Sequence, residues 1–179
     1  MSEVKYDVSE VLISEEQLKQ RVKELGAQIT KDFEGEELLL VGILKGSVPF
    51  LADLMRTITL ETVKLDFMVV SSYGSGTVSS GKINIKKDLE TDIRGKNVIV
   101  VEDIIDSGNT LSCLKEVLLQ REPKSLKIAT MLDKPSRRQS PITPDYCGFA
   151  VEDKFIVGYG LDLDQKYRHL PYISWVKTE

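Results

Sequence analysis

Three carboxylates crowd one short stretch, VIVVEDIIDSGNTL, which spans residues 98–111. Its first half is an apolar run typical of a strand buried on both faces, and its second half is a turn of small polar residues. Apolar residues at helical spacing follow, so we expect a helix to begin at this turn. Backbone N–H groups at a helix start bind phosphate, and Gly108 lets the backbone approach closely. Ser107 and Thr110 add hydroxyl donors, so the turn predicts a phosphate site.

The acids beside this turn need a different partner, because carboxylates repel phosphate. Glu102 and Asp103 can accept hydrogen bonds from the vicinal hydroxyls of a sugar, and the same hydroxyls can bridge to magnesium. A ribose 5-phosphate with free 2- and 3-hydroxyls satisfies both halves of the stretch. The alternative is a solvated acidic loop that caps a helix, but two acids directly after a buried apolar run are uncommon in such loops.

The elements that would position this stretch follow from the spacing of apolar residues. Ser14 and Gln17 fit a capping box, and a helical stripe follows them. We expect further helices at residues 48–55 and from 111 onward, and strands at residues 38–44, 63–70, 98–101 and 125–131. A Ser/Gly-rich loop is expected at residues 71–82, and a closing hairpin or strand pair at residues 147–157.

This alternation predicts an α/β fold with a mostly parallel twisted sheet flanked by helices on both faces. Ligands of such sheets bind beyond the carboxyl ends of the strands. Lys45, the turn at residues 102–110 and Lys134 each follow a predicted strand, so we expect them to lie at that edge.

Composition narrows the classes of function. The chain of 179 residues is 41% apolar, which predicts one domain over residues 1–179. The net charge of −4 and the lack of a basic run argue against nucleic-acid partners, and no apolar stretch approaches the ~18 residues of a membrane span. Cys113 and Cys147 lack CxxC spacing, so we expect reduced thiols and a cytoplasmic protein. A single histidine, His169, excludes a His-rich metal site.

Residues 76–83 imitate a nucleotide triphosphatase P-loop. They satisfy G-x-x-x-x-G-K, but Ile83 stands where a Ser or Thr would hold magnesium. A Ser/Gly-rich stretch precedes them instead of an adjoining buried strand, so the match does not indicate a triphosphatase.

Taken whole, VIVVEDIIDSGNTL resembles the 5-phosphoribosyl-1-pyrophosphate-binding signature of type I phosphoribosyltransferases. Further matches follow the family order over most of the chain, namely LVGILKGSVPFLADL, DFMVVSSYGSGTVSSG, MLDKPSRR and DKFIVGYGLDLDQKYRHLPYI. The LDK and DKFIVGYGLD segments narrow the resemblance to the bacterial branch that acts on 6-oxopurines.

The resemblance implies the type I phosphoribosyltransferase fold, with a small hood formed by terminal segments. It also implies a purine salvage enzyme that transfers 5-phosphoribose from phosphoribosyl pyrophosphate to hypoxanthine or guanine, with Mg²⁺ as cofactor. The products are then IMP or GMP and pyrophosphate. Members of the family usually form homodimers or homotetramers.

Carried over residue by residue, the resemblance assigns four residues to the base. Asp106 would be the general base or acid facing purine N7, and Lys134 the donor to the 6-oxo group. Phe155 would stack on the ring, and Ile156 would contact it through the backbone. An ammonium only donates, so Lys134 suits the oxygen of hypoxanthine or guanine and not the donor amine of adenine. Without the resemblance, Lys134 would be expected at the surface and Phe155 in the core.

The pyrophosphate side rests on the resemblance as well. Lys45 and Gly46 match the pyrophosphate loop, assisted by Arg168 from near the end of the chain. The family often has a cis peptide before that lysine, which predicts a cis Leu44–Lys45 bond although such bonds are rare. Asp162 matches a magnesium-side acid.

Two further features complete the implied site. Glu102, Asp103 and Asp162 form its metal set. Ser72, Tyr73 and the glycines after them resemble a mobile lid that would keep water from an oxocarbenium-like sugar. In the phosphate turn, which comprises Ser107, Gly108, Asn109 and Thr110, some relatives carry lysine at the position of Asn109; a contribution through its N–H would make the change harmless.

Two other functions remain open. The first is a regulator that kept this fold but binds RNA, which would need a basic face that the chain lacks. The second is a sister transferase for xanthine, adenine or a pyrimidine. Lys134 argues against adenine but does not exclude xanthine.

Overall fold

The computed structural model describes residues 6–72 and 83–178, and the structural statements below concern these residues. In chain order the elements are β1 (Tyr6–Ile13), α1 (Glu15–Asp32), β2 (Leu38–Ile43), α2 (Val48–Met55), β3 (Val63–Ser72), β4 (Ile83–Lys87), β5 (Asn97–Ile105), α3 (Asn109–Leu119), β6 (Ser125–Asp133), the short 3-10 helix η1 (Pro135–Arg137), β7 (Tyr146–Ala150), β8 (Ile156–Val157) and β9 (Ile173–Thr178).

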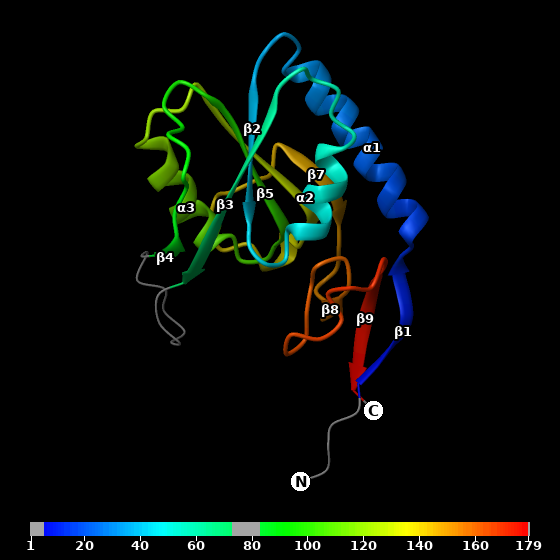
Figure 1. Cartoon of the computed structure of the whole chain (residues 1–179). Coiled ribbons are helices and arrows are strands. Elements are labelled where there is room, and N and C mark those ends of the chain that lie inside the picture. Colours follow the sequence, from blue (N-terminus) through cyan, green and yellow to red (C-terminus); the bar gives the residue numbers. More distant parts are fainter. Residues whose placement is uncertain (1–5, 73–82, 179) are drawn as a thin grey trace.

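The main sheet has the strand order β4-β3-β2-β5-β6-β7. Its strands run parallel except β4, which lies antiparallel to β3 at one edge. Helices α1 and α2 cover one face and α3 covers the other (Figure 1). The predicted α/β fold with a mostly parallel sheet is therefore confirmed. Strands β3 and β4 follow β2 on one side of the sheet, whereas β6 and β7 follow β5 on the other side. The strand order therefore reverses between β2 and β5, and a ligand crevice is expected at the carboxyl ends of these two strands.

Apolar strands make this layered arrangement possible. All six residues of β2 are buried, as are the first five of β5. Side chains of a strand alternate between faces, so Leu38 and Leu40 join the core under α1 and α2, whereas Leu39 and Val41 join the core under α3. Full burial of one such side chain contributes about 1.5–3 kcal/mol, which explains why these strands are continuously apolar.

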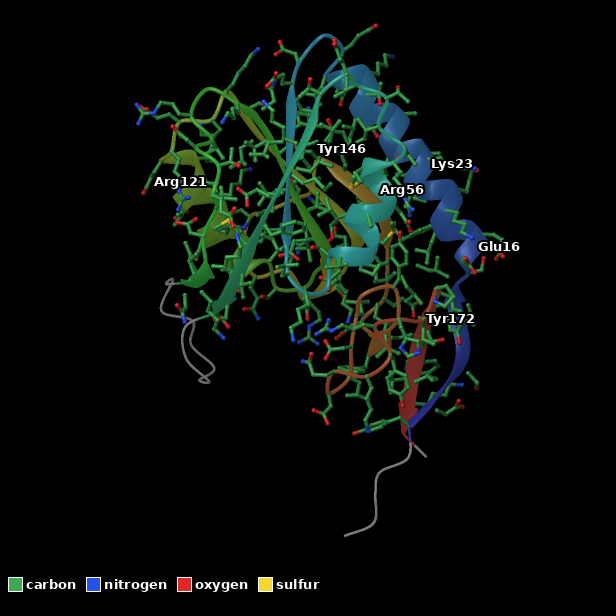
Figure 2. The ribbon with its side chains drawn as sticks, viewed as in Figure 1. Glu16, Lys23, Arg56, Arg121, Tyr146 and Tyr172 are labelled. Atoms are coloured by element: carbon green, nitrogen blue, oxygen red, sulfur yellow. The ribbon has the colours of Figure 1, made fainter. Side chains whose placement is uncertain are left out.

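Helix α1 begins at the predicted capping box. The Ser14 hydroxyl accepts from the Gln17 amide at 3.2 Å, and the Gln17 side chain accepts from the Ser14 amide at 2.8 Å. Glu16 and Lys23 are exposed on the outer side of the helix (Figure 2). The predicted stripe on the inner side is buried, as it comprises Leu18, Val22, Leu25 and Ile29.

A second, three-stranded sheet forms a hood beyond the carboxyl ends of the main strands (Figure 1). Its order is β1-β9-β8, so the two ends of the described chain pair with each other as antiparallel strands. A hood built from terminal segments was predicted and is confirmed.

A closing hairpin or strand pair was predicted at residues 147–157; two strands do lie there, but they do not pair with each other. Strand β7 extends the main sheet parallel to β6, whereas β8 leaves that sheet and pairs with β9 in the hood. Polar residues 152–154 lie between the two strands, and each strand pairs with its other neighbour in chain order, β7 with the preceding strand β6 and β8 with the following strand β9. Local pattern therefore indicates a strand but does not identify its partner.

No helix in the described part of the chain has the length and apolar character needed to cross a membrane.

A buried acid holds the segment between β4 and β5. Asp66, in β3, is 5% exposed, and its carboxylate accepts from the amides of Phe67 at 2.7 Å, Glu90 at 2.9 Å and Thr91 at 2.8 Å. Burial raises the pKa of Asp66, but the hydrogen bonds from these three amides outweigh burial and hold that pKa below its ordinary value.

We expect Asp66→Asn to lower the free energy of unfolding by about 1–3 kcal/mol at pH 7, because an amide group would face backbone donors. The pKa is lower in the folded state, so the carboxylate stabilises the fold above its unfolded pKa of ~3.9, and this stability is lost as the pH falls further. Urea unfolding should therefore show a difference in the free energy of unfolding between the wild type and Asp66→Asn at pH 7, and a smaller difference near pH 3. Asp92→Asn is the control, since exposed Asp92 accepts from one amide, that of Arg94; an equal loss there would contradict the account.

Candidate active site

Most of the predicted site residues within the described ranges lie at the carboxyl edge of the main sheet, under the hood. The loop after β2, the end of β5, the turn into α3 and η1 supply one side of this edge. The loops around β8 supply the other, so the site lies between the two sheets (Figure 1).

The phosphate turn leads into α3 as predicted, with the helix starting at Asn109. Gly108 is its N-cap residue at φ +78° and has no side chain that could cap the helix; among the described residues, the Ser107 hydroxyl lies 3.4 Å from the Asn109 backbone amide. A Cβ at Gly108 would lie 2.5 Å from Ile142 and 2.7 Å from the Ser140 hydroxyl, so both backbone shape and space require glycine. The first amides of α3 thus keep their capacity to bind an anion.

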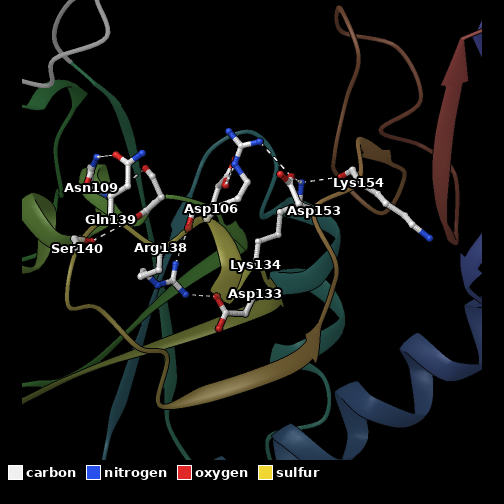
Figure 3. Close-up of polar contacts among 11 residues, drawn as sticks. Asp106, Asn109, Asp133, Lys134, Arg138, Gln139, Ser140, Asp153 and Lys154 are labelled. Carbon is white, nitrogen blue, oxygen red and sulfur yellow. Dashed lines mark hydrogen bonds and ion pairs between the residues drawn. The ribbon is translucent and has the colours of Figure 1, made fainter.

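A segment after η1 supports this turn from behind. The amides of Gln139 and Ser140 donate to the Ser107 carbonyl at 2.9 and 3.4 Å. The Asn109 side chain donates to Gln139 at 2.9 Å (Figure 3). Asn109 is therefore held through its side chain, while its own amide lies at the helix start, 3.4 Å from the Ser107 hydroxyl.

Arg138 ties the same turn to β6. Its guanidinium donates to the Asp106 carbonyl at 2.8 Å and forms an ion pair with Asp133, the last residue of β6 (Figure 3). Both side chains of the pair are largely buried, at 16% and 13% exposure. Sequence reasoning missed this pair, although the two arginines of MLDKPSRR were a visible signal.

The two acids expected in the turn lie instead inside a strand. Strand β5 extends beyond the predicted residues 98–101 to Ile105, because its last residues continue to pair with β6. Burial raises the pKa of Glu102 well above its ordinary value, and the negative charge of Asp103 raises it further. The pKa of Asp103 is raised as well, mainly by burial. Both groups would gain from a cation or from hydroxyl donors.

The loop after β2 lies directly against these acids. A Cβ on Gly46 would lie 1.6 Å from a carboxylate oxygen of Asp103, so only glycine fits. Gly160, at φ +101°, approaches the other side of the loop, where its Cβ would lie 1.9 Å from the Gly46 carbonyl. The predicted cis Leu44–Lys45 bond is present.

Charged residues of the loop after β8 meet at the same place. Arg168 donates to the Gly160 carbonyl at 2.6 Å and pairs with Asp162 at 2.6 Å, while its Nε is buried and has no hydrogen-bond partner among the described residues. The backbone N–H of Gln165 donates to the Asp162 carboxylate at 2.8 Å. The side-chain oxygen of Gln165 accepts from the Lys45 ammonium at 3.4 Å. The predicted pyrophosphate residues Lys45 and Arg168 thus come together from distant parts of the chain.

The predicted metal set does not form a closed cage. No three His, Cys, Asp or Glu side chains within the described ranges are arranged to hold a metal ion. Asp162 is already paired with Arg168, although its charge raises the pKa of Asp103. The acids can thus contribute one or two ligands to an ion whose other ligands come from elsewhere.

The predicted base residues face the turn from the end of β6 and from β8. Lys134 is buried, at 7% exposure, and its ammonium donates to the Lys154 carbonyl at 2.7 Å (Figure 3). Ile156 is buried in β8, whereas the Phe155 side chain is 53% exposed. The core position that Phe155 would take without the resemblance is therefore wrong, as is the surface position for Lys134.

Asp106 lies between the phosphate turn and these base residues. Its Oδ1 is 2.8 Å from Nε of Arg137, whose Nη1 is 3.2 Å from Asp153. Neither Arg137 nor Asp153 was among the predicted site residues.

Ser72 is the last residue of β3 and pairs with Ile83 of β4. Tyr73, the glycines of the predicted lid and the P-loop imitation up to Lys82 lie outside the described residues.

Comparison with known proteins defines the class. The family model of the phosphoribosyl transferase domain matches residues 10–164. This chain belongs to that family.

Its relatives narrow the class to purine enzymes. The chain is 51% identical to the hypoxanthine-guanine phosphoribosyltransferase of Bacillus subtilis, over 97% of this chain and 96% of that protein. It is 53% identical to the hypoxanthine phosphoribosyltransferase of Escherichia coli, over 93% and 94%. A crystal structure of a hypoxanthine-guanine phosphoribosyltransferase from Bacillus anthracis matches with a TM-score of 0.91 and 50% identity, covering 97% of this chain and all of that one. The resemblance predicted from the motifs is therefore confirmed.

We expect Arg138→Met to lower the free energy of unfolding by about 3–5 kcal/mol, because it leaves Asp133 as an uncompensated buried charge. Combining it with Asp133→Asn should recover part of that loss, since removing both partners is cheaper than removing one. Urea unfolding of the two single variants and the double variant measures this. A double variant whose loss equals the sum of both single losses would contradict the coupling.

Proposed function

We propose that this chain transfers the 5-phosphoribosyl group of phosphoribosyl pyrophosphate to N9 of hypoxanthine or guanine, releasing pyrophosphate and forming IMP or GMP. One observation carries the proposal: a single edge of the sheet holds the amides at the start of α3, two partly buried acids and a buried ammonium. These suit, in turn, a phosphate, sugar hydroxyls and an oxygen on a base. The names of the relatives support the same reading.

In this reaction the bond from N9 to C1 of the sugar forms as the bond from C1 to pyrophosphate breaks, and the electron pair leaves with pyrophosphate. The sugar passes through an oxocarbenium-like state, and positive charge grows on the purine. Asp106 accepts the proton from purine N7, so its carboxylate stabilises that charge. The Lys134 ammonium orients the base through its 6-oxo group, with Phe155 exposed to stack on the ring.

The proposal includes magnesium. Mg²⁺ commonly binds through one or two carboxylates together with substrate phosphates and water, so the acids at Glu102 and Asp103 fit it without a closed cage. When bound, the ion would neutralise charge on the pyrophosphate. The buried Nε of Arg168, which has no hydrogen-bond partner within the described ranges, and the ammonium of Lys45, which contacts Gln165 of the same loop, would fit this anion. We also propose Asp162, which pairs with Arg168, as the third acid of the set.

Two broader features belong to the proposal. A homodimer or homotetramer, usual in the family, is to be tested by sedimentation. A cytoplasmic location, predicted from composition, fits a salvage enzyme that uses soluble substrates.

The decisive assay measures nucleotide formation from phosphoribosyl pyrophosphate and each of five bases, namely hypoxanthine, guanine, xanthine, adenine and uracil, with Mg²⁺ or with EDTA. We expect IMP and GMP with Mg²⁺ only. Asp106→Asn should lower kcat by about 10²–10⁴-fold, the usual contribution of a general base. Full turnover by this variant would remove Asp106 from its role, and absence of both products from the wild type would overturn the function.

Lys134→Met should weaken the use of hypoxanthine by about 10–100-fold in kcat/KM, because a charged hydrogen bond to the 6-oxo group is lost. The rate with adenine should fall less, so the preference between the two bases narrows. Lys64→Met is the matched control, as Lys64 is an exposed lysine paired with Glu37. If both bases lose equally, Lys134 does not read the 6-position.

A further inference from the structure

We propose that Arg137 competes with the purine for Asp106, so that a base must displace this arginine before it can bind. The inference rests on the proposed function, because it assigns Asp106 to the base. It adds a residue that sets the affinity for the base without taking part in the transfer itself.

The first observation is the contact between the two side chains. Arg137 Nε lies 2.8 Å from Asp106 Oδ1, one of the two carboxylate oxygens to which the N7–H of a purine could donate. That oxygen is buried, yet it receives no aligned hydrogen bond from the described residues. The guanidinium therefore forms an ion pair with Oδ1, but Oδ1 can still accept a hydrogen bond. An aligned N–H of a base would make the better contact.

The second observation concerns the other polar contact of the base. The Lys134 ammonium, expected to donate to the 6-oxo group, instead donates to the Lys154 carbonyl at 2.7 Å. Asp153 connects Lys134 with Arg137, because its Oδ1 lies 3.7 Å from the Lys134 ammonium and 3.2 Å from Arg137 Nη1. The chain's own groups thus already contact both side chains that a 6-oxopurine is proposed to use, Asp106 and Lys134 (Figure 3).

Arg137 is placed so that it can leave. Its side chain lies in η1, a single short turn, and is 50% exposed, while the Asp106 side chain is 46% exposed. Ion pairs at such exposure contribute little, which corresponds to about two- to fivefold in a binding constant. This weak contact keeps the Asp106 carboxylate beside a positive charge when no base is bound, and it yields when one arrives.

We test this with Arg137→Met, which keeps the aliphatic stem and removes the charge. The expected result is a two- to fivefold lower KM for hypoxanthine, with the KM for phosphoribosyl pyrophosphate unchanged. Arg137→Lys, a cation without the planar fork, should fall between the wild type and Arg137→Met. Arg94→Met is the control, because Arg94 is an exposed arginine paired with Glu122 at 3.3 Å and should leave both constants unchanged.

Salt gives an independent readout on the wild type. Hypoxanthine is uncharged at pH 7, so screening acts on the arginine and not on the base. Raising the ionic strength from about 0.01 to 0.15 M at saturating phosphoribosyl pyrophosphate should lower the KM for hypoxanthine in the wild type but not in Arg137→Met. A KM for hypoxanthine that is unchanged or higher in Arg137→Met, or a salt effect that survives in it, overturns the inference. If the wild type forms no IMP or GMP, the proposed function fails instead.

Discussion

The acids at the end of β5, Glu102 and Asp103, place two partly buried carboxyl groups a few residues from a turn suited to a phosphate. The pKa values of Glu102 and Asp103 are raised because burial disfavours their charged forms. Besides the phosphate at the turn, a pyrophosphate group can bind near these acids only if positively charged groups are close. The fold brings such groups from other parts of the sequence. Arg168 lowers the pKa of Asp103, opposing the effect of burial. The uncapped start of α3 provides the positive end of a helix dipole.

The need for positively charged groups beside these acids explains why the site is built from two sheets. The main sheet brings the acids and the phosphate turn to one edge, but its strands end there and leave that edge open. Arg168 and Phe155 come from the loops around β8, which the pairing of β1 with β9 holds in place. The terminal strands thus act on the site through the loop they anchor, although neither strand carries a predicted site residue.

Local pattern predicted the elements well because their causes are local. Continuous apolar runs identified β2 and β5, and helical spacing with a capping box identified α1. The partner of β8 escaped prediction because the apolar pattern of a strand does not show which neighbouring strand it pairs with, and β8 pairs with the following strand β9 instead of with β7. The extension of β5 through its two acids escaped for the same reason, since pairing with β6 outweighs the poor strand propensity of carboxylates.

The residues of the candidate site likewise fall into those that local sequence predicted and those that it did not. The residues proposed to contact a ligand belong to motifs and could be named from the sequence. Residues that support them, such as Arg138 behind the turn and Arg137 over Asp106, could not, because an arginine pairs with whatever carboxylate the fold brings near. The two adjacent arginines have opposite surroundings: Arg138 is largely buried against Asp133, whereas Arg137 is half-exposed. One guanidinium is therefore fixed within the scaffold, while its neighbour is held weakly enough to move, and only the three-dimensional structure distinguishes the two.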